Sequence, residues 1–447
     1  MKMMIYTLLF CSTCSASFGQ MLFSSSPIVQ AEDKPGAYTG IVVEQYADGH
    51  PKLWRQEKNG KANGLWQEWY PNGTLRYRAW WKDGLGNGKW EYFYANGQLR
   101  SESFYINDIA QGLAVSYHIN GQVAQQTTYL NGQLDGLVCT YDVNGMLLSR
   151  KHYQAGIQAI DEPILFQAGR IATDTANEWD ITFTPDNQTA YFTRRLTDGT
   201  SQKIYQTSKD DRGNWTEPVV APFSTHRDEG GFISPDGKYF FFGSCRPIED
   251  TSPAHDLDMN IWMMTQTDAG WSPPQPLPSS INKKRTDNDE WPRNYETGPT
   301  IDAKGNLYYW TQSSTNRSSN LYTSSMRKNG EFSSPTELIP PSHNQGFDSG
   351  PVISPDGTLL CFVSSNRIES FGEEDLYYSR WNGSVWSAPK NLGPVINSNY
   401  NEGAPRFSPD GKYFLFSSDR AENFDASGER IWSIYYMETQ FLTIESQ

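Results

Sequence analysis

Apolar and aromatic positions recur with a 24-residue period in the first third of the chain. Each unit opens with a glycine, and a second glycine, preceded by Asp or Asn, follows nine residues later. The opening glycines are Gly40, Gly64, Gly88, Gly112 and Gly136, and the second ones are Gly49, Gly73, Gly97, Gly121 and Gly145. Asn-Gly between strand-like runs favours a β-hairpin, because a type I′ turn needs positive φ at both central positions. The pattern predicts hairpin repeats over residues 40–157, with two short strands and two tight turns in each unit.

Aromatic residues occupy fixed offsets within these units. One such series is Trp69, Phe93, Tyr117 and Tyr141, and another is Trp81, Tyr105, Tyr129 and Tyr153. A single unit cannot bury its aromatic face, whereas stacked neighbours can. The pattern G-x-W-x-x-[WFY]-x-x-N-G-x-L resembles the MORN-variant repeat of bacterial proteins described as antitoxins. The first unit departs from it at Gln45. A self-stacking spacer is favoured over a ligand platform, since a fold alone does not give a function.

A second period begins at about residue 163. The phrase Ser-Pro-Asp-Gly followed by an aromatic strand starts at Ser234, Ser354 and Ser408, with weaker copies at Thr184 and Asp302. Each copy is a tight turn between two strands. A third strand begins with an aliphatic-aromatic pair, as at Ile261-Trp262, and a fourth carries aromatic-x-x-Pro, as from Trp271 to Pro274. Four strands per roughly 50 residues are typical of a propeller blade.

The last copy lacks a fourth strand after Trp432, and the first is preceded by a spare extended segment, residues 163–169. We therefore predict an all-β chain whose residues 163–440 form a five-bladed propeller closed by this segment. The Ser-Pro-Asp-Gly repeats resemble the TolB-type, WD-like propeller family, which implies an envelope-associated interaction role.

The amino-terminal residues have the pattern of an export signal. Lys2 precedes the short apolar run Met3–Phe10, and Ser17-Phe18-Gly19 resembles a cleavage site, so residues 1–19 are predicted to be a signal peptide and 20–39 a linker. Neither Cys11 nor Cys14 follows a small residue, so a lipoprotein ranks second. We expect a periplasmic or secreted protein with no transmembrane segment in its mature chain. The remaining Cys139, Cys245 and Cys361 are expected to be buried thiols.

The formal net charge of −14 argues against a nucleic-acid partner. Polar candidates instead gather on one predicted face of the propeller, where the first strand of each blade starts and the second ends. The acids at the start of the first strands are Glu178, Asp228, Glu296, Asp348 and Glu402, and the arginines at the ends of the second strands are Arg194 or Arg195, Arg246, Arg367 and Arg420. They form either a structural ring of ion pairs that ties the blades together, which is favoured, or a polar ligand site.

The loop of residues 278–295 on the same face combines Trp291 with clustered charge, including Arg293, and ends at Tyr295. Long loops on rigid scaffolds often carry function, and an exposed Trp beside Arg is a plausible hot spot. The alternative for this loop is a solvated insertion.

We therefore predict an exported, non-catalytic protein whose propeller face binds an envelope protein, peptide or glycan, without metal or cofactor. The ligand-binding residues predicted for it are the five acids, Arg246, Arg367, Arg420, Trp291, Arg293 and Tyr295. The six His residues show no metal-ligand spacing, and there is no G-x-S-x-G serine motif. The alternative is a carbohydrate-active enzyme of the glycoside hydrolase type on a five-bladed propeller, which needs two carboxyl groups in one pocket. An antitoxin-like partner is a third reading, against which the export signal counts.

Overall fold

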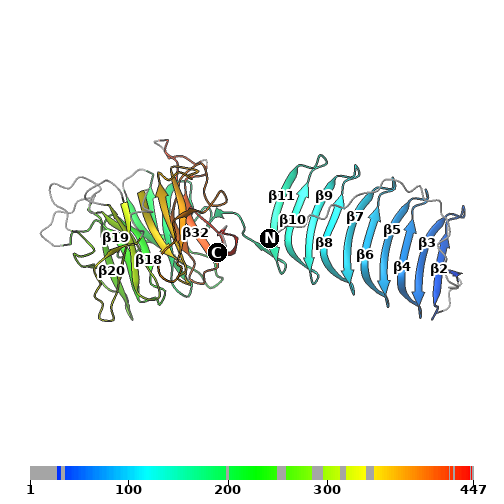
Figure 1. Cartoon of the computed structure of the whole chain (residues 1–447), viewed down its shortest axis with the longest axis horizontal. Helices are drawn as coiled ribbons and strands as arrows, with labels where there is room; N and C mark the ends of the chain where they lie inside the picture. The colour runs from blue at the N-terminus through cyan, green and yellow to red at the C-terminus, as the bar shows by residue number, and fades with distance from the viewer. Residues whose placement is uncertain are drawn as a thin grey trace. The chain divides into compact units, whose positions relative to one another are not determined.

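The computed structural model describes residues 28–31, 36–197, 201–248, 258–283, 295–312, 319–338, 347–421, 423–425, 428–442 and 444. The predicted signal peptide lies outside these residues. The chain divides into two compact units, Met1–Ala159 and Ile160–Gln447 (Figure 1). Among the described residues, no helix has the length and apolar character needed to cross a membrane.

The first unit is one sheet of 12 strands in sequence order, which we call the array. Its strands are β1 (Ile28–Gln30), β2 (Gly40–Gln45), β3 (Pro51–Lys58), β4 (Lys61–Trp69), β5 (Leu75–Lys82), β6 (Leu85–Phe93), β7 (Leu99–Ile106), β8 (Ile109–Tyr117), β9 (Val123–Leu130), β10 (Gln133–Tyr141), β11 (Leu147–Gln154) and β12 (Ile157–Ala159). Part of the segment expected to be a linker therefore forms β1, which pairs with β2 in parallel. The other neighbours in the array are antiparallel, as hairpin repeats require.

The two turns of each unit differ from one another. At Asn59-Gly60 the φ angles are 51° and 76°, so both residues are left-handed, as a type I′ turn demands. At Asn72-Gly73 only the glycine has positive φ, at 79°. The Gly73 N–H donates to Tyr70 O at 2.9 Å, and the strand register shifts beside the turn. This second kind is a type I turn with a bulge, so the prediction of type I′ geometry was wrong for it.

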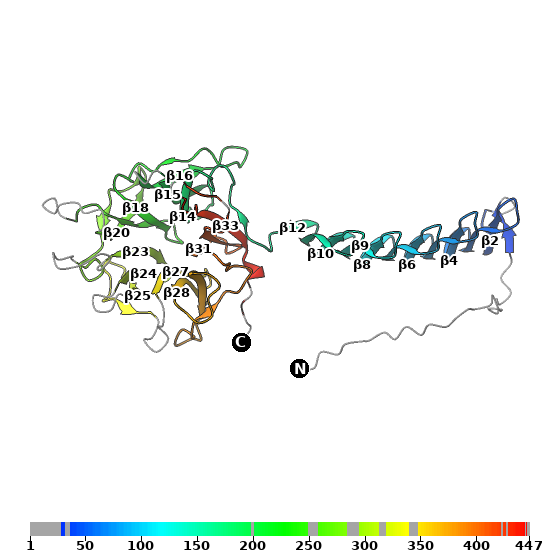
Figure 2. The same ribbon diagram turned by 90° about the horizontal axis from the view of Figure 1, so that it is seen from above.

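The second unit is a propeller of five sheets around a centre (Figure 2). Blade 1 is β14 (Ala176–Phe183), β15 (Thr189–Leu196), β16 (Gln202–Ser208) and β17 (Val219–Val220). Blade 2 is β18 (Asp228–Ile233), β19 (Tyr239–Ser244) and β20 (Asn260–Thr267), with β21 (Gly270–Trp271) and β22 (Gln275–Pro276) outside. Blade 3 is β23 (Glu296–Ile301), β24 (Asn306–Gln312), β25 (Ser319–Ser325) and β26 (Thr336–Glu337), and blade 4 is β27 (Phe347–Ile353), β28 (Leu359–Ser365), β29 (Glu374–Arg380) and β30 (Lys390–Asn391).

Blade 5 closes the ring with a strand from the start of the propeller. Its own strands are β31 (Glu402–Phe407), β32 (Tyr413–Ser418) and β33 (Ser433–Glu438), and β13 (Ile164–Leu165) pairs with β33 as the outer strand. The Phe166 N–H also donates to Ile434 O at 2.8 Å. The predicted five-bladed closure is therefore confirmed. The outer strands are shorter than predicted, because in most blades only two residues after the aromatic-x-x-Pro proline enter the ladder.

Side-chain hydrogen bonds explain the repeated Ser-Pro-Asp-Gly turn. The Ser234 hydroxyl donates to Asp236 at 2.7 Å, while the N–H groups of Lys238 and Tyr239 donate to Asp236 and Ser234. Gly237 takes a φ of 75°. The aromatic strand that follows is fully buried, with Phe240, Phe241 and Phe242 at 0% exposure. The turn thus ends one strand and aims the next into the core of the propeller.

Candidate functional site

The five predicted acids are buried inside the blades rather than open to a ligand. Their exposed fractions are 0–1%. Four of them meet the predicted arginines, with nitrogen–oxygen distances of 3.1 Å for Glu178–Arg194, 3.2 Å for Asp228–Arg246, 2.9 Å for Asp348–Arg367 and 3.0 Å for Glu402–Arg420. Their proposed role in ligand binding stays a prediction, and the structure adds that four of these carboxylates already have a guanidinium partner.

These pairs hold each blade to the loop that enters it. Arg246 donates to Ser244 Oγ at 2.8 Å and to the Phe223 carbonyl at 3.0 Å, in addition to Asp228. Arg194 likewise donates to the Arg170 carbonyl at 3.0 Å. The pairs therefore stabilise strands and loops within one blade, whereas the sequence suggested links between blades. Removing one member of such a pair leaves an uncompensated buried charge.

Glu296 in blade 3 differs from the other four acids. The Thr311 hydroxyl donates to its Oε1 at 3.0 Å, and its other oxygen is buried without a hydrogen-bond partner. No arginine contacts it among the described residues. Burial raises the pKa of Glu296 from 4.5 to about 8. Its carboxyl group therefore keeps its proton to a higher pH than an ordinary glutamate does.

We expect Glu296→Gln to change how stability depends on pH. Because the pKa is raised in the folded state, the wild-type protein loses stability as pH rises from 4.5 towards about 8, by at most about 1.4 kcal/mol per pH unit. The Gln variant lacks this loss, so its melting temperature relative to wild type should be higher at pH 8 than at pH 5. Thermal melts of the full-length protein at both pH values measure it.

Asp228→Asn is the matched control, because it removes the buried carboxylate that Arg246 binds at 3.2 Å. It should lower stability by about 3–5 kcal/mol throughout. An equal effect of Glu296→Gln at pH 5 and pH 8 would contradict the assignment of a raised pKa.

The residues that reach the centre of the ring lie directly after the acids. Side chains alternate along a strand, so a buried acid turns its neighbour towards the central channel. These neighbours are Trp179, Glu229, Thr297, Ser349 and Gly403, and they line a cavity of about 290 Å³. Each is followed by a residue in the left-handed region, with φ of 55° at Asp180, 65° at Gly230, 62° at Gly298, 54° at Gly350 and 48° at Ala404. The strand register shifts at each of these places, so every inner strand carries a bulge at the channel.

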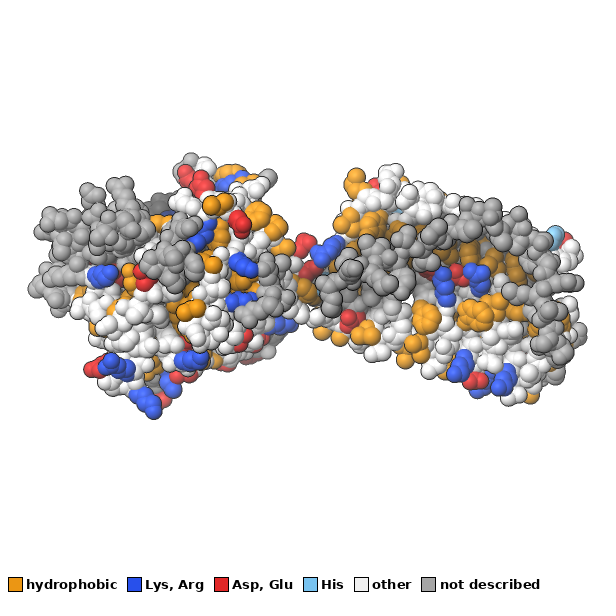
Figure 3. Space-filling view, in the orientation of Figure 1, with side chains coloured by type: hydrophobic (Ala, Val, Ile, Leu, Met, Phe, Trp, Pro, Cys, Tyr) orange, Lys and Arg blue, Asp and Glu red, His pale blue; other side chains and the backbone are white. Residues whose placement is uncertain are grey.

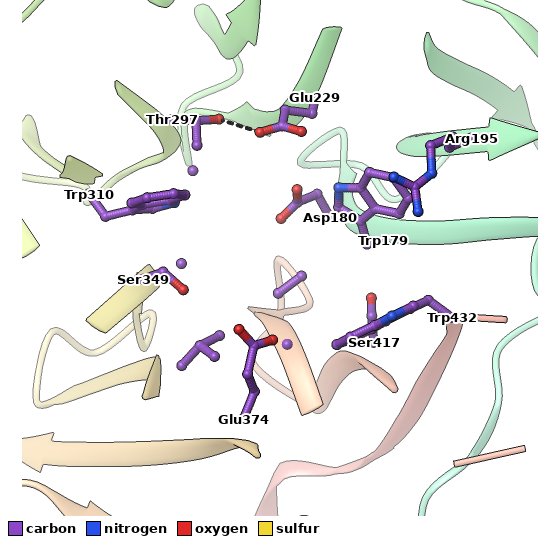
Figure 4. Close-up of a pocket in the computed structure, with 15 residues that line it drawn as sticks. Trp179, Asp180, Arg195, Glu229, Thr297, Trp310, Ser349, Glu374, Ser417 and Trp432 are labelled. Carbon is purple, nitrogen blue, oxygen red and sulfur yellow. Dashed lines mark hydrogen bonds between the residues drawn. The ribbon is translucent and has the colours of Figure 1, made fainter. Parts of the chain in front are cut away.

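Three carboxylates and three tryptophans lie around this cavity, which we call the channel pocket (Figure 4). The tryptophans are Trp179, Trp310 and Trp432, and the carboxylates belong to Asp180, Glu229 and Glu374. The carboxylates come from blades 1, 2 and 4 and the tryptophans from blades 1, 3 and 5, so only closure of the ring brings them together.

Glu229 accepts hydrogen bonds from three neutral donors. These are the Tyr295 hydroxyl at 3.0 Å, the Thr297 hydroxyl at 3.1 Å and the Gln202 amide at 2.8 Å. Burial raises the pKa of Glu229, and the nearby Asp180 carboxylate raises it further. The Glu229 side chain is thus fixed in orientation next to a second acidic group.

Asp180 is bound by an arginine that lies 226 residues later in the sequence, in the last blade. Arg406 Nη2 donates to Asp180 Oδ1 at 2.8 Å, and the Arg406 side chain is 1% exposed. Burial raises the pKa of Asp180, while the Arg406 guanidinium opposes this. The pair joins blade 1 to blade 5 below the pocket.

Glu374 is the least constrained of the three acids. It is half-buried at the start of β29, and its carboxylate forms no hydrogen bond or ion pair within the described chain. Burial raises its pKa, and the negative charges of Asp419 and Glu373 add to the rise. Glu374 therefore keeps its proton to a higher pH than an ordinary glutamate does.

Of the predicted loop, the structure describes only residues 278–283 and 295. Trp291 and Arg293 lie outside the described residues, and Tyr295 is 7% exposed, with its hydroxyl bound to Glu229. Sequence reasoning missed Asp180, Glu229 and Glu374. A signal was present for two of them: the four positions equivalent to Asp180 are Gly or Ala, and none equivalent to Glu229 is acidic. Among the described residues, no group of three or more His, Cys, Asp or Glu is placed to hold a metal ion.

Comparisons with known proteins match part of the array to a repeat family and list solved structures that are similar to part of the chain. The model of the MORN repeat variant matches residues 62–82 and 87–107. No curated protein matches the chain. An α-L-arabinofuranosidase from Podospora anserina shares 13% identity over 62% of this chain and 98% of its own, with a TM-score of 0.40. An endo-arabinase from Bacteroides thetaiotaomicron shares 13% identity over 62% of this chain and 98% of its own, with a TM-score of 0.39.

Other similar structures include a family 117 glycoside hydrolase from Zobellia galactanivorans, with 11% identity over 64% of this chain and 92% of its own and a TM-score of 0.40. A hydrazine synthase from Kuenenia stuttgartiensis is also similar, at 11% identity over 59% of this chain and 40% of its own, with a TM-score of 0.37. At this level of identity the likeness is one of fold. Several of these structures are named as sugar hydrolases, which stands against the predictions of a non-catalytic binding protein and of no enzyme; the alternative, a carbohydrate-active enzyme, is a proposal for this chain.

Proposed function

We propose that the propeller is a carbohydrate-active enzyme that hydrolyses a glycosidic bond in the channel pocket. The observation that carries this is the set of three acidic side chains, Asp180, Glu229 and Glu374, on the wall of one tryptophan-lined cavity. Glycoside hydrolysis needs two carboxyl groups in different protonation states, one to give a proton and one to act as a carboxylate. Burial raises the pKa of all three carboxyl groups, and the Arg406 guanidinium opposes that rise at Asp180.

Glu374 is the proton donor in this proposal. Its pKa is raised by burial and by two neighbouring acids, and no donor in the described chain stabilises its ionised form. It can therefore protonate the oxygen of the leaving sugar. A carboxyl group with a raised pKa is what such a step requires.

Asp180 is the group that acts as a carboxylate. Arg406 favours the ionised form at a distance of 2.8 Å, against the effect of burial. Asp180 either activates a water molecule or attacks the sugar directly, according to its separation from Glu374. Glu229, held by Tyr295, Thr297 and Gln202, lies close enough to Asp180 for the charge of one to affect the other.

The aromatic walls fit a sugar ring. Trp179, Trp310 and Trp432 offer flat apolar surfaces for the C–H face of a pyranose or furanose, while Ser349, Ser417 and Thr297 offer hydroxyl groups. A cavity of about 290 Å³ holds one or two sugar units rather than a long chain segment.

Release of reducing sugar from polysaccharides tests the proposal. We expect the full-length protein to hydrolyse at least one member of a panel of arabinans, xylans, glucans and galactans. Asp180→Asn should reduce the rate by a factor of about 10²–10⁴. Asp186→Asn, in an exposed turn, is the control and should keep the activity. Hydrolysis that survives Asp180→Asn would place the chemistry elsewhere.

We further propose that the chain is exported and meets its substrate in the cell envelope or outside the cell. The support is the signal-like pattern from Lys2 to Gly19. The Ser-Pro-Asp-Gly turns support a place for the propeller within the TolB-type, WD-like group.

A further inference from the structure

The array contains a second cavity, of about 450 Å³, on one face of strands β6 to β9. It lies within a sheet whose strands are paired on both sides, so it is not an open strand edge. Its volume falls in the range of about 300–1,000 Å³ that small-molecule sites occupy. We call it the array pocket.

The array pocket exists because two units depart from the aromatic pattern of the repeat. Trp66 and Trp90 fill one position of the unit, and the next equivalent is Ala114. At two further positions a serine follows a tyrosine of the preceding unit, since Ser101 is equivalent to Tyr77 and Ser116 to Tyr92, and no other unit has an aromatic residue there. Where the large rings are present they pack closely, with centroids 5.0 Å apart for Trp81–Trp90 and 4.9 Å for Tyr77–Tyr92. Where they are replaced, the same backbone leaves a hollow.

The walls and floor of the array pocket have contrasting chemistry. Tyr92 and Tyr105 end the packed aromatic cluster on one side, and Tyr129 lies on β9. Ser101, Ser103 and Ser116 supply hydroxyl groups from the strands between. Within the described chain, none of these serine or tyrosine hydroxyls forms a side-chain hydrogen bond. The pocket therefore presents aromatic rings beside hydrogen-bonding groups that have no protein partner.

The charge of the lining indicates an uncharged ligand. Glu102 is the one charged residue among the lining residues. Its carboxylate is already bound by Lys89 Nζ at 2.7 Å and by the Tyr117 hydroxyl at 2.9 Å. An anionic ligand has no cation to meet there, and a lipid chain would bury the free hydroxyls without partners, which is costly.

We propose that the array pocket binds a segment of a neutral glycan. Flat rings stack on the C–H faces of sugars, and free hydroxyls exchange hydrogen bonds with sugar hydroxyls. Each unit adds two strands, or about 10 Å of sheet, so an extended glycan can cross the strands in register with the repeat. Extended binding surfaces of this kind are typical of repeat proteins. The proposal concerns the array alone and does not need the propeller to be an enzyme.

A filled pocket is the direct test. Ala114→Trp restores the residue that the repeat carries at Trp66 and Trp90, so the fold should tolerate it. Leu113→Trp is the matched control, because Leu113 is 53% exposed and the alternation of the strand turns it to the opposite face. Full-length protein carrying Glu374→Gln, which removes the proposed proton donor of the propeller, serves as the parent for both variants.

Binding is first measured on a printed array of neutral and acidic oligosaccharides, and then by titration calorimetry with the best neutral probe. We expect Ala114→Trp to weaken binding at least tenfold with an unchanged or higher melting temperature, Tyr105→Ala to weaken it, and Leu113→Trp to leave it unchanged. Three results would overturn the proposal. They are an unchanged affinity in Ala114→Trp, a loss of affinity in Leu113→Trp equal to that in Ala114→Trp, and binding of acidic probes alone. If Trp432→Ala rather than Ala114→Trp abolishes binding, the array site fails while the channel pocket stands. If Ala114→Trp abolishes binding but the wild-type protein hydrolyses no glycan, the array site stands and the proposed enzyme activity of the channel pocket fails.

Discussion

Glu374→Gln should abolish glycan hydrolysis by the full-length protein while leaving its melting temperature nearly unchanged. The side chain forms no hydrogen bond or ion pair in the described structure, so the amide removes a proton donor and no structural contact. Loss of a general acid reduces the rate by a factor of about 10²–10⁴. Substrates with a good leaving group, such as nitrophenyl glycosides, need less protonation and should be less affected.

The pH profile gives this prediction a second readout. Glu374 acts as an acid only while protonated, so kcat/KM should fall as pH rises through its pKa. Because burial, Asp419 and Glu373 raise that pKa, the fall should come at a higher pH than for an ordinary glutamate. Glu374→Gln should remove this limb of the profile from the residual activity.

Glu373→Gln is the matched control, since Glu373 is the exposed neighbour of Glu374. It should keep the activity and move the alkaline limb slightly to lower pH, because one of the charges that raise the pKa of Glu374 is lost. Full activity in Glu374→Gln would exclude Glu374 as the proton donor.

Arg406→Met should be among the most destabilising single substitutions in the propeller. It leaves the Asp180 carboxylate buried without its guanidinium, which typically costs about 3–5 kcal/mol. Arg406 also links blade 5 to blade 1 and lies over the Phe232 ring at 5.9 Å. Its loss therefore also weakens the contact between the first and last blades. Urea and thermal unfolding of the full-length protein would measure the change in the propeller transition.

A double-mutant cycle separates the ion pair from simple packing. Asp180→Asn with Arg406→Met removes both charges, and we expect the pair to be more stable than Arg406→Met alone. Arg327→Met, at an exposed arginine, should change stability by less than about 0.5 kcal/mol. Additive losses in the cycle would show that Asp180 and Arg406 do not depend on each other.

The surface of the array carries exposed hydrophobic side chains that follow the pattern of the repeat. Large apolar side chains remain exposed there, among them Trp80 at 47% and Leu113 at 53%, and Figure 3 shows many hydrophobic side chains on the array. A single sheet has two faces and too little chain to cover both. These residues follow the period of the repeat, so the pattern predicted strands correctly but not which face would be covered.

Repetition in the sequence determined the architecture of both units. Asp-Gly or Asn-Gly turns every 24 residues predicted the hairpins. Three Ser-Pro-Asp-Gly turns and two weaker copies predicted the five blades and the strand borrowed by the last blade, and β13 pairs with β33 as expected. The physical reason is local: turn chemistry and alternation act within a few residues, so they can be read from the chain directly. The buried thiols of Cys139, Cys245 and Cys361 follow from the same strand pattern.

The site depended on contacts that no local pattern contains. The acids repeated in every blade proved to be internal partners of arginines, whereas Asp180, Glu229 and Glu374 reach the channel pocket from three different blades. A bulge turns Asp180 inward at a φ of 55°, and Arg406, 226 residues away, binds it. Positions that recur serve the fold, because equivalent positions meet equivalent surroundings. Residues that differ between equivalent positions meet only when the ring closes, because closure brings distant parts of the chain within hydrogen-bonding distance.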